Sequence, residues 1–507
     1  MPFRDLRSFS GKGLFYKISF LLTILVYFIT ALNSHGYYHA DEHYQILEFA
    51  EYIDGKNSTE HLAWEFEARI RSAVQPVIAF LVFRTLSVFS VVDPYSKALV
   101  LRLLTTCLAL LIIRRFVKNT IASFTSEWER RAYFLLSFFL WVIPFLSVRF
   151  SGETWSGLFL LLSLAIISTG HQKSWQAYKI GLVLGLAFIF RFQAGFAMIG
   201  ILLWLLIVKK TGFHDILKIG IGIVAIVLAG FCVDTWFYGE AVFTPWNYLM
   251  SVLNSGGTGY GTSPWYFYIL ELLQFPTFFI GIPLVLSIML IMIYEPKNLY
   301  LWILLVFIVI HSFVPHKEDR FLFPLFYLFP IILMTGYTKL KSILEQQKIL
   351  KMATYVLAIM FLVINLGGLI TMGLQSAAKG RMTISKYIHD HYADEHINMI
   401  YTYWANPYRP FQGLYSRFYL EKEMSHQFIG DLYHLSDSVI LPDAVNFLVV
   451  RKEELKPDHC GEMISGYRFI LIMQSIPGWV EVLTDNLYKG FKEGNVLCLY
   501  RYETTAY

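Results

Sequence analysis

The sequence predicts an all-α polytopic membrane protein that ends in a small α/β domain. Of its 507 residues, 56% are hydrophobic and 16% are charged, whereas soluble globular chains carry about 25% charged residues. Mean hydropathy is +0.51, and long apolar segments recur up to residue 373. These observations exclude a disordered protein, a nucleic-acid-binding module and an ordinary cytosolic enzyme. The net charge of +5 is too small over this length to indicate a polyanionic partner.

The apolar segments predict the transmembrane helices, since about 20 mainly apolar residues cross about 30 Å of hydrocarbon. They lie near residues 14–32, 131–148, 153–170, 176–192, 194–208, 215–233, 267–293, 299–315, 321–338 and 351–373. The first is expected to be a retained anchor, because no small-residue cleavage site follows it. Between 74 and 116, two stretches that contain Arg84 and Arg102 compete for one crossing, and the other is expected to be interfacial or re-entrant. The sequence therefore predicts about 11 spans.

Lysine and arginine in short loops predict the orientation, because they mark the cytoplasmic side. They cluster in the N-terminal tail, at 114–131, at 209–210 and at 339–351. The remaining loops then face the other side, namely 33–73, 149–153, 191–194, 234–266, 316–320 and the C-terminal tail. Since these loops hold most of the unusual polar motifs, we expect an extracytoplasmic active site.

Composition changes after residue 373. We therefore divide the chain into a transmembrane domain, 1–373, with a catalytic exterior loop at 33–73, and an extracytoplasmic domain, 374–507. Short apolar runs at 438–441 and 446–450 predict strands, and 382–392 predicts a helix, which together indicate an α/β domain. Cys460 and Cys498 could pair in an oxidising compartment or remain two free thiols.

The densest polar motif is His39-Ala-Asp-Glu-His-Tyr-Gln45, which begins an amphipathic helix just beyond the first span. Asp41 could simply cap a surface helix. Two adjacent carboxylates, Asp41 and Glu42, flanked by histidines favour a functional site instead. The motif also matches the His-x-x-Glu-His pattern of a zinc peptidase class. Zinc would need both histidines on one helical face and a third ligand, and we expect His39 to precede the helix.

Further candidates lie at the exterior ends of other spans. Arg149 with Glu153, and Arg191 with Gln193, could snorkel towards water or face a polar cavity. Residues 316–320 hold five ionisable side chains, which could form a solvated loop or bind a phosphate. In 64–72, Arg69 and Arg71 are expected to pair with Glu65 and Glu67.

Taken together, these motifs resemble those of a known family. The stretches that carry the resemblance are His39–Gln45, Trp64–Glu67 with Ile70–Ser72, Asp234–Gly239, Phe243–Tyr248 and Pro315–Phe321. They resemble the GT-C-type mannosyltransferases that build GPI anchors and asparagine-linked glycan precursors, above all the GPI mannosyltransferase branch. The resemblance covers residues 14–340, and it departs from the family pattern at Ala40, where proline is frequent, and at Asp319.

The resemblance implies a transferase that uses a polyprenyl-phosphate sugar, usually dolichyl-phosphate mannose, outside the cytoplasm. The family's proposed catalytic base in the first exterior loop corresponds to Asp41, with Glu42 beside it. The family's His-Lys-Glu segment corresponds to His316, Lys317 and Glu318, near the lipid phosphate. In-line displacement would invert the anomeric centre and turn a β-linked donor into an α-mannoside.

The resulting prediction is a hexosyltransferase, with mannose as the expected sugar, that acts on a glycan or glycolipid acceptor in the membrane. Asp41 and Glu42 are the catalytic candidates. The substrate-binding candidates are His39, His43, Gln45, Arg149, Arg191, His316, Lys317, Glu318 and Arg320. No cofactor is required and no metal site is predicted; a divalent metal is allowed but not expected, because arginine and lysine can neutralise a monophosphate leaving group.

Two other functions are weighed against the transferase. One is a membrane zinc peptidase that uses His39, Glu42 and His43. The other is a lipid or sugar transporter, which would carry polar residues within its spans. The short loops favour a bacterial inner membrane with the site facing the periplasm; in a eukaryote the site would face the lumen of the endoplasmic reticulum.

Overall fold

The structure is a computed structural model. It describes residues 12–170, 174–254, 261–344, 347–377, 380–409, 414–420, 424–455, 463–464, 467–488 and 496–503. The chain divides into two compact units. The first comprises the chain up to Ala31, Ala68–Gln75 and Leu101–Gly373, and the second comprises Leu32–Glu67, Pro76–Val100 and the chain from Leu374 onwards. Much of the 33–73 loop thus belongs to the same unit as the C-terminal domain.

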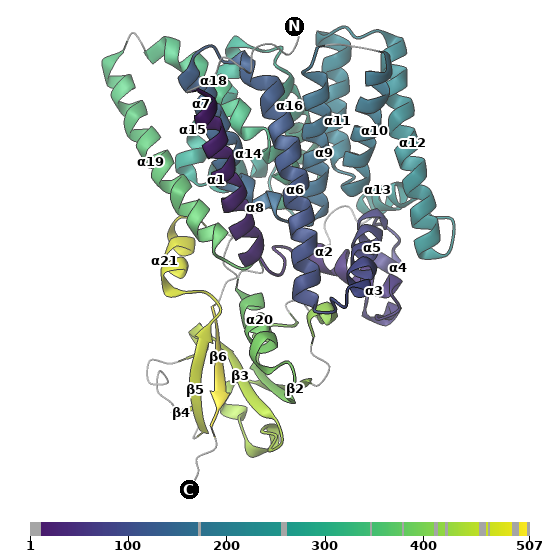
Figure 1. Cartoon of the computed structure of the whole chain (residues 1–507), viewed down its shortest axis with the longest axis vertical. Helices are drawn as coiled ribbons and strands as arrows, with labels where there is room; N and C mark the ends of the chain where they lie inside the picture. The colour runs from purple at the N-terminus through teal and green to yellow at the C-terminus, as the bar shows by residue number, and fades with distance from the viewer. Residues whose placement is uncertain are drawn as a thin grey trace. The chain divides into compact units, whose positions relative to one another are not determined.

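The first unit is helical, and many of its helices run alongside one another (Figure 1). Its helices are α1 (Lys12–Asn33), α6 (Pro94–Thr120), α7 (Glu127–Phe139), α8 (Val142–Ser147), α9 (Gly152–Ile167), α10 (Ser174–Phe190), α11 (Ala194–Leu203), α12 (Phe213–Tyr238), α13 (Thr244–Asn254), α14 (Phe267–Gln274), α15 (Phe278–Tyr294), α16 (Leu299–Ser312), α17 (Phe323–Phe326), α18 (Phe329–Leu344) and α19 (Lys348–Gly373). A π-helical turn, η3 (Trp204–Val208), extends α11, and a 3₁₀ turn, η4 (Asp319–Leu322), precedes α17.

Fewer helices than predicted are long enough to cross a bilayer alone. Within the described residues, α1, α6, α12 and α19 qualify by length and composition, and the count reaches six if the bent pairs α15–α16 and η4/α17–α18 each form one span. The 16-residue α9 reaches only about 24 Å, less than the hydrocarbon thickness. The predicted 11 spans are therefore not confirmed, although the protein is clearly membrane-embedded. Between residues 74 and 116, where two stretches compete for one crossing, α6 is long enough to cross the bilayer. The 15-residue α5 (Val74–Val88) is not.

Breaks within apolar segments explain part of this difference. The predicted span 131–148 is divided between α7 and α8 at Leu140. There the Trp141 N–H donates to the side-chain oxygen of Asn365 at 2.8 Å, and the Asn365 amide donates to the Phe139 carbonyl at 2.8 Å. The Asn365 side chain from α19 thus replaces two hydrogen bonds that the helix loses at this break. Backbone N–H and C=O groups need such partners where no water is available to bind them.

This arrangement makes Asn365 important for stability. We expect Asn365→Leu to lower the free energy of unfolding by about 1–3 kcal/mol for each buried group left unpaired. Thermal melting in detergent measures the effect. The control is Leu366→Ala on the same helix, where the side chain is 58% exposed. Equal melting temperatures for Asn365→Leu and this control would contradict the prediction.

The second unit contains short helices and a mixed sheet. Its helices are α2 (Ala40–Tyr44), α3 (Leu47–Ile53), α4 (Trp64–Glu67), most of α5, the start of α6, α20 (Arg381–Tyr392) and α21 (Gly478–Asn486). Its strands are β1 (Ile397–Thr402), β2 (Met424–Gly430), β3 (Val445–Arg451), β4 (Met463–Ile464), β5 (Tyr467–Gln474) and β6 (Leu497–Tyr502). The strand order is β2-β1-β3-β6-β5-β4; β1 runs parallel to both of its neighbours, and the other pairs are antiparallel. The predicted α/β character of this region is confirmed.

Helix α20 covers one face of this sheet through Ile384 and Ile388, which pack with strand residues such as Phe447. The strand predicted at 446–450 forms β3, but the one predicted at 438–441 is wrong. There the Asn446 side chain accepts from the Leu441 N–H and donates to its carbonyl, so a side chain satisfies backbone groups that a strand would pair. Cys498 is buried, and Cys460 lies outside the described residues.

Candidate active site

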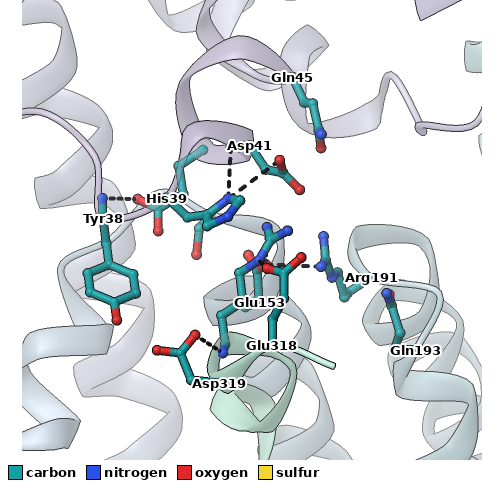
Figure 2. A network of polar contacts seen from close by, with 12 residues as sticks. Tyr38, His39, Asp41, Gln45, Glu153, Arg191, Gln193, Glu318 and Asp319 are labelled. Carbon is teal, nitrogen blue, oxygen red and sulfur yellow. Dashed lines mark hydrogen bonds and ion pairs between the residues drawn. The ribbon is translucent and has the colours of Figure 1, made fainter. Parts of the chain in front are cut away.

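In the second unit, His39 caps the short helix that carries the two candidate carboxylates. Its Nδ1 accepts a hydrogen bond from the Asp41 N–H at 3.3 Å, and the helix begins at Ala40 (Figure 2). His39 therefore precedes the helix, as predicted. The Asp41 carboxylate lies 3.5 Å from the same ring nitrogen, and its side chain is 15% exposed. An acid in the first turn is also favoured by the helix dipole.

The two adjacent carboxylates have different surroundings. Glu42 turns back and accepts a hydrogen bond from the Tyr38 N–H at 3.1 Å, so this side chain helps to close the helix N-terminus. Asp41 instead faces the half-exposed imidazole of His39. Asp41 is consequently the better candidate for a group that exchanges a proton with a substrate, and Glu42 has a capping role.

His43 and Gln45 lie on the buried side of the same segment. His43 is 0% exposed, and its Nε2 lies 2.7 Å from the Glu48 carboxylate. Gln45 donates to Glu65 at 2.8 Å, which connects the end of α2 to α4. Their direct contact with substrate stays a prediction; the surroundings of both side chains favour a role in holding α2.

The donor geometry around α2 does not fit the zinc-peptidase alternative. His39 precedes the helix, whereas His43 is buried against Glu48, so the two rings do not share one helical face. Across the described residues, no group of three or more histidine, cysteine, aspartate or glutamate side chains is arranged to hold a metal ion.

In the first unit, Glu153 is the centre of a buried charged cluster. One of its carboxylate oxygens lies 3.3 Å from a terminal nitrogen of Arg191 and 3.2 Å from one of Arg320. The three side chains come from the start of α9, the end of α10 and η4, and each is at most 7% exposed. Figure 2 shows Arg191 directed towards Glu153. Pairing of this kind is required for charges taken out of water.

The local sequence explains how these groups meet. Ser151 caps α9 by accepting from the Thr154 N–H, which places Glu153 in the first helical turn. Gly152 lets α9 approach the end of α10, because a Cβ at this position would lie only 2.6 Å from the Phe190 carbonyl oxygen. Arg191 follows directly and reaches the carboxylate.

The 316–320 segment adds a second layer of charges. Glu318 binds the Nε of Arg320 with one oxygen and lies 2.8 Å from His316 Nε2 with the other. Asp319 accepts from the Arg320 N–H at 2.6 Å. The predicted candidates Arg191, His316, Glu318 and Arg320 thus belong to one connected cluster with Glu153.

Lys317 and Arg149 are also buried in this unit. The Lys317 ammonium donates to the carbonyls of Ser263 and Val314 at 2.9 and 2.6 Å, and burial lowers its pKa. The Arg149 guanidinium lies 5.1 Å from the Phe145 ring centroid. Two buried guanidinium groups, those of Arg191 and Arg320, meet at Glu153 in this unit. Paired guanidinium groups of this kind can also bind an anionic ligand.

A different buried acid ties the 68–75 segment to the helices of the first unit. Asp234 accepts from the Ala73 N–H at 2.7 Å, from the Ser72 hydroxyl at 3.1 Å and from Thr244 at 2.6 Å. The predicted pairing of Arg69 with Glu65 or Glu67 is replaced by an ion pair with Glu240.

Sequence reasoning did not assign roles to Glu153, Asp234 or Glu48. A signal existed for Glu153, since Ser151 can cap a helix whose first turn favours an acid, and an acid at the start of an apolar segment needs a partner for its charge. No comparable signal marked Glu48, because its burial depends on residues far away in the chain.

The fold defines the class of protein. Its fold is that of the GT-C membrane glycosyltransferases: the crystal structure of ArnT from Cupriavidus metallidurans bound to undecaprenyl phosphate superposes with a TM-score of 0.54. The superposition covers 97% of this chain and 98% of that chain at 10% sequence identity, and at this identity it shows the fold alone.

The particular family follows from the sequence profile of the Alg9-like mannosyltransferases, which matches residues 18–409. The chain belongs to this family. It is 27% identical to GPI mannosyltransferase 3 of Candida albicans over 333 residues, which are 64% of this chain and 65% of that protein. It is 34% identical to alpha-1,2-mannosyltransferase ALG9 of Mus musculus over 130 residues, 22% of this chain and 20% of that protein. The match thus spans slightly less than two thirds of the Candida relative, and the profile extends beyond residue 340.

The close approach of α9 to the Phe190 carbonyl at Gly152 provides a test of the cluster around Glu153. We expect Gly152→Ala to push α9 away from Phe190 and to lower the free energy of unfolding by about 1–3 kcal/mol. Thermal melting in detergent measures this. The matched control is Gly220→Ala in α12, where a Cβ meets nothing within 4 Å. If both variants melt at the wild-type temperature, the close approach has no energetic consequence.

Proposed function

We propose that the protein is an integral-membrane mannosyltransferase that moves mannose from a polyprenyl-phosphate donor to a hydroxyl of a glycan or glycolipid, on the extracytoplasmic face. The observation that carries the proposal is the family match across residues 18–409, which includes both Asp41 and the cluster around Glu153. Two relatives are named GPI mannosyltransferase 3 and alpha-1,2-mannosyltransferase. The structural neighbour ArnT was crystallised with undecaprenyl phosphate.

The chemistry needs two kinds of group. The acceptor oxygen forms a bond to the anomeric carbon of mannose, and the bond from that carbon to the phosphate oxygen breaks. The electron pair leaves with the lipid phosphate, and the acceptor proton passes to a base. A carboxylate can take the proton, and guanidinium groups can stabilise the phosphate. In-line displacement converts a β-linked donor into an α-mannoside.

The described side chains suit these roles. Asp41 is the proposed base, since Glu42 is committed to the Tyr38 N–H. Arg191 and Arg320 are the proposed phosphate ligands, because a guanidinium carries five N–H donors and can bind a phosphate oxygen while it keeps a carboxylate partner. The proposal requires that Asp41 and these arginines act on one substrate molecule.

Lys317 is proposed to act less directly. Its ammonium already donates to the Ser263 and Val314 carbonyls, so it fixes the loop that precedes Glu318. The charge it contributes to the cluster remains favourable for an anion. Arginine and lysine provide the neutralisation that a monophosphate leaving group needs, so the proposal includes no metal.

Removal of the base tests the mechanism. We expect Asp41→Asn to reduce mannosyl transfer by about 10²- to 10⁴-fold, the usual contribution of general-base catalysis. The assay uses purified protein in detergent, dolichyl-phosphate mannose with radiolabelled sugar, and glycolipids extracted from the source membranes. Asp215→Asn is the matched control, because Asp215 also lies in the first turn of a helix. A fully active Asp41→Asn protein would remove Asp41 from the mechanism.

Replacing the planar guanidinium of Arg320 with an ammonium group tests the phosphate site. We expect Arg320→Lys to raise the KM for the donor by about tenfold or more, since a charge-assisted hydrogen bond is worth about 1.5–3 kcal/mol. The same assay at varied donor concentration measures it. Arg131→Lys, which changes a half-exposed partner of Glu127, is the control. An unchanged donor KM in Arg320→Lys would argue against a phosphate contact.

A further inference from the structure

Within the second unit, the short segment at 414–419 binds the segment that carries Asp41. The Tyr44 hydroxyl donates to the Leu414 carbonyl at 3.1 Å and lies 3.2 Å from the Ser416 hydroxyl. The Tyr37 hydroxyl lies 3.2 Å from the same Ser416 oxygen. Ser416 is 0% exposed, so these contacts are shielded from water. One serine thus joins two tyrosines on either side of Asp41.

A buried carboxylate makes the second connection between the same segments. Glu48 is 1% exposed, and one of its oxygens accepts from the Phe418 N–H at 3.1 Å and lies 2.7 Å from His43 Nε2. Its other oxygen accepts from the Asn57 amide at 2.9 Å. The Tyr419 ring stacks on the His43 ring at a centroid distance of 5.5 Å. The buried Glu48 carboxylate is thus bonded to three donors, and it holds α3, on which it lies, against α2 and the 414–419 segment.

These contacts matter for Asp41 because α2 has only five residues. A helix of that length is not stable by itself in water, since nucleation is unfavourable. Asp41 lies two and three residues before His43 and Tyr44, so the contacts of these two side chains set the direction in which the α2 N-terminus points. The contacting residues 414–419 also lie beyond the end of the family match at 409.

We propose that Ser416 and Glu48 are positioning residues, through which the C-terminal domain holds α2 and orients Asp41 for the reaction. This inference rests on the proposed function, in which Asp41 is the base. It gives the C-terminal domain a definite part in catalysis. Neither Ser416 nor Glu48 touches the substrate in this proposal.

The test uses the full-length protein in detergent and two gentle substitutions. Ser416→Ala removes the oxygen shared by both tyrosines, and Tyr44→Phe keeps the ring while it removes one hydroxyl. Ser385→Ala is the matched control, because Ser385 is also 0% exposed in the same unit and, among the described residues, bonds only within its own helix. Hydrogen–deuterium exchange of residues 37–47, measured by mass spectrometry without any ligand, reports the mobility of α2 directly.

We expect faster exchange at 37–47 in Ser416→Ala and Tyr44→Phe but not in Ser385→Ala. We also expect kcat for mannosyl transfer to fall by about 10- to 100-fold, the cost of misplacing a reacting group by about 1 Å, while the donor KM is unchanged. A purely structural role would lower the melting temperature and the yield without this change in kcat.

The outcomes separate this inference from the function on which it rests. An inactive Asp41→Asn protein together with wild-type kcat in both Ser416→Ala and Tyr44→Phe would overturn the positioning role alone. Unchanged exchange at 37–47 in both variants would do the same. A fully active Asp41→Asn protein would overturn the proposed base and the positioning inference together.

Discussion

Charges buried among apolar helices persist only when they are paired, and the Glu153 carboxylate meets this condition by binding Arg191 and Arg320 with one oxygen. The three groups stabilise one another in the absence of any ligand. The close approach at Gly152 makes the pairing possible. An anion that enters this cluster meets guanidinium groups that are already desolvated and held in place, so little reorganisation accompanies binding.

The same constraint recurs in the second unit with different chemistry. Glu48 is a buried acid that binds an imidazole, a backbone N–H and a side-chain amide instead of two arginines. In both units a single glutamate joins elements that lie far apart in the sequence, and in both it orients groups that the proposed reaction needs.

Much of this could be predicted from local patterns, and the failures have physical reasons. Segment hydropathy predicted that the chain is rich in apolar helices, and it located the polar motifs at their ends, including Arg191 and Arg320. It did not predict how many of these helices are long enough to cross a bilayer. It did not predict the break between α7 and α8, because Asn365 supplies the missing hydrogen bonds from α19. No local pattern reveals that the buried Glu48 carboxylate accepts a hydrogen bond from the Phe418 N–H, because Phe418 lies 370 positions further along the chain.

A helix as short as α2 poses a problem for the proposed catalytic group that it carries. A base must be held within about 0.5 Å of its productive position to act efficiently, yet the five-residue α2 has too few hydrogen bonds of its own to remain rigid. Its neighbours in the second unit supply what it lacks, through Ser416 and Glu48. A loop fastened to a folded sheet domain loses its conformational entropy when the protein folds, so that this cost does not recur each time a substrate binds.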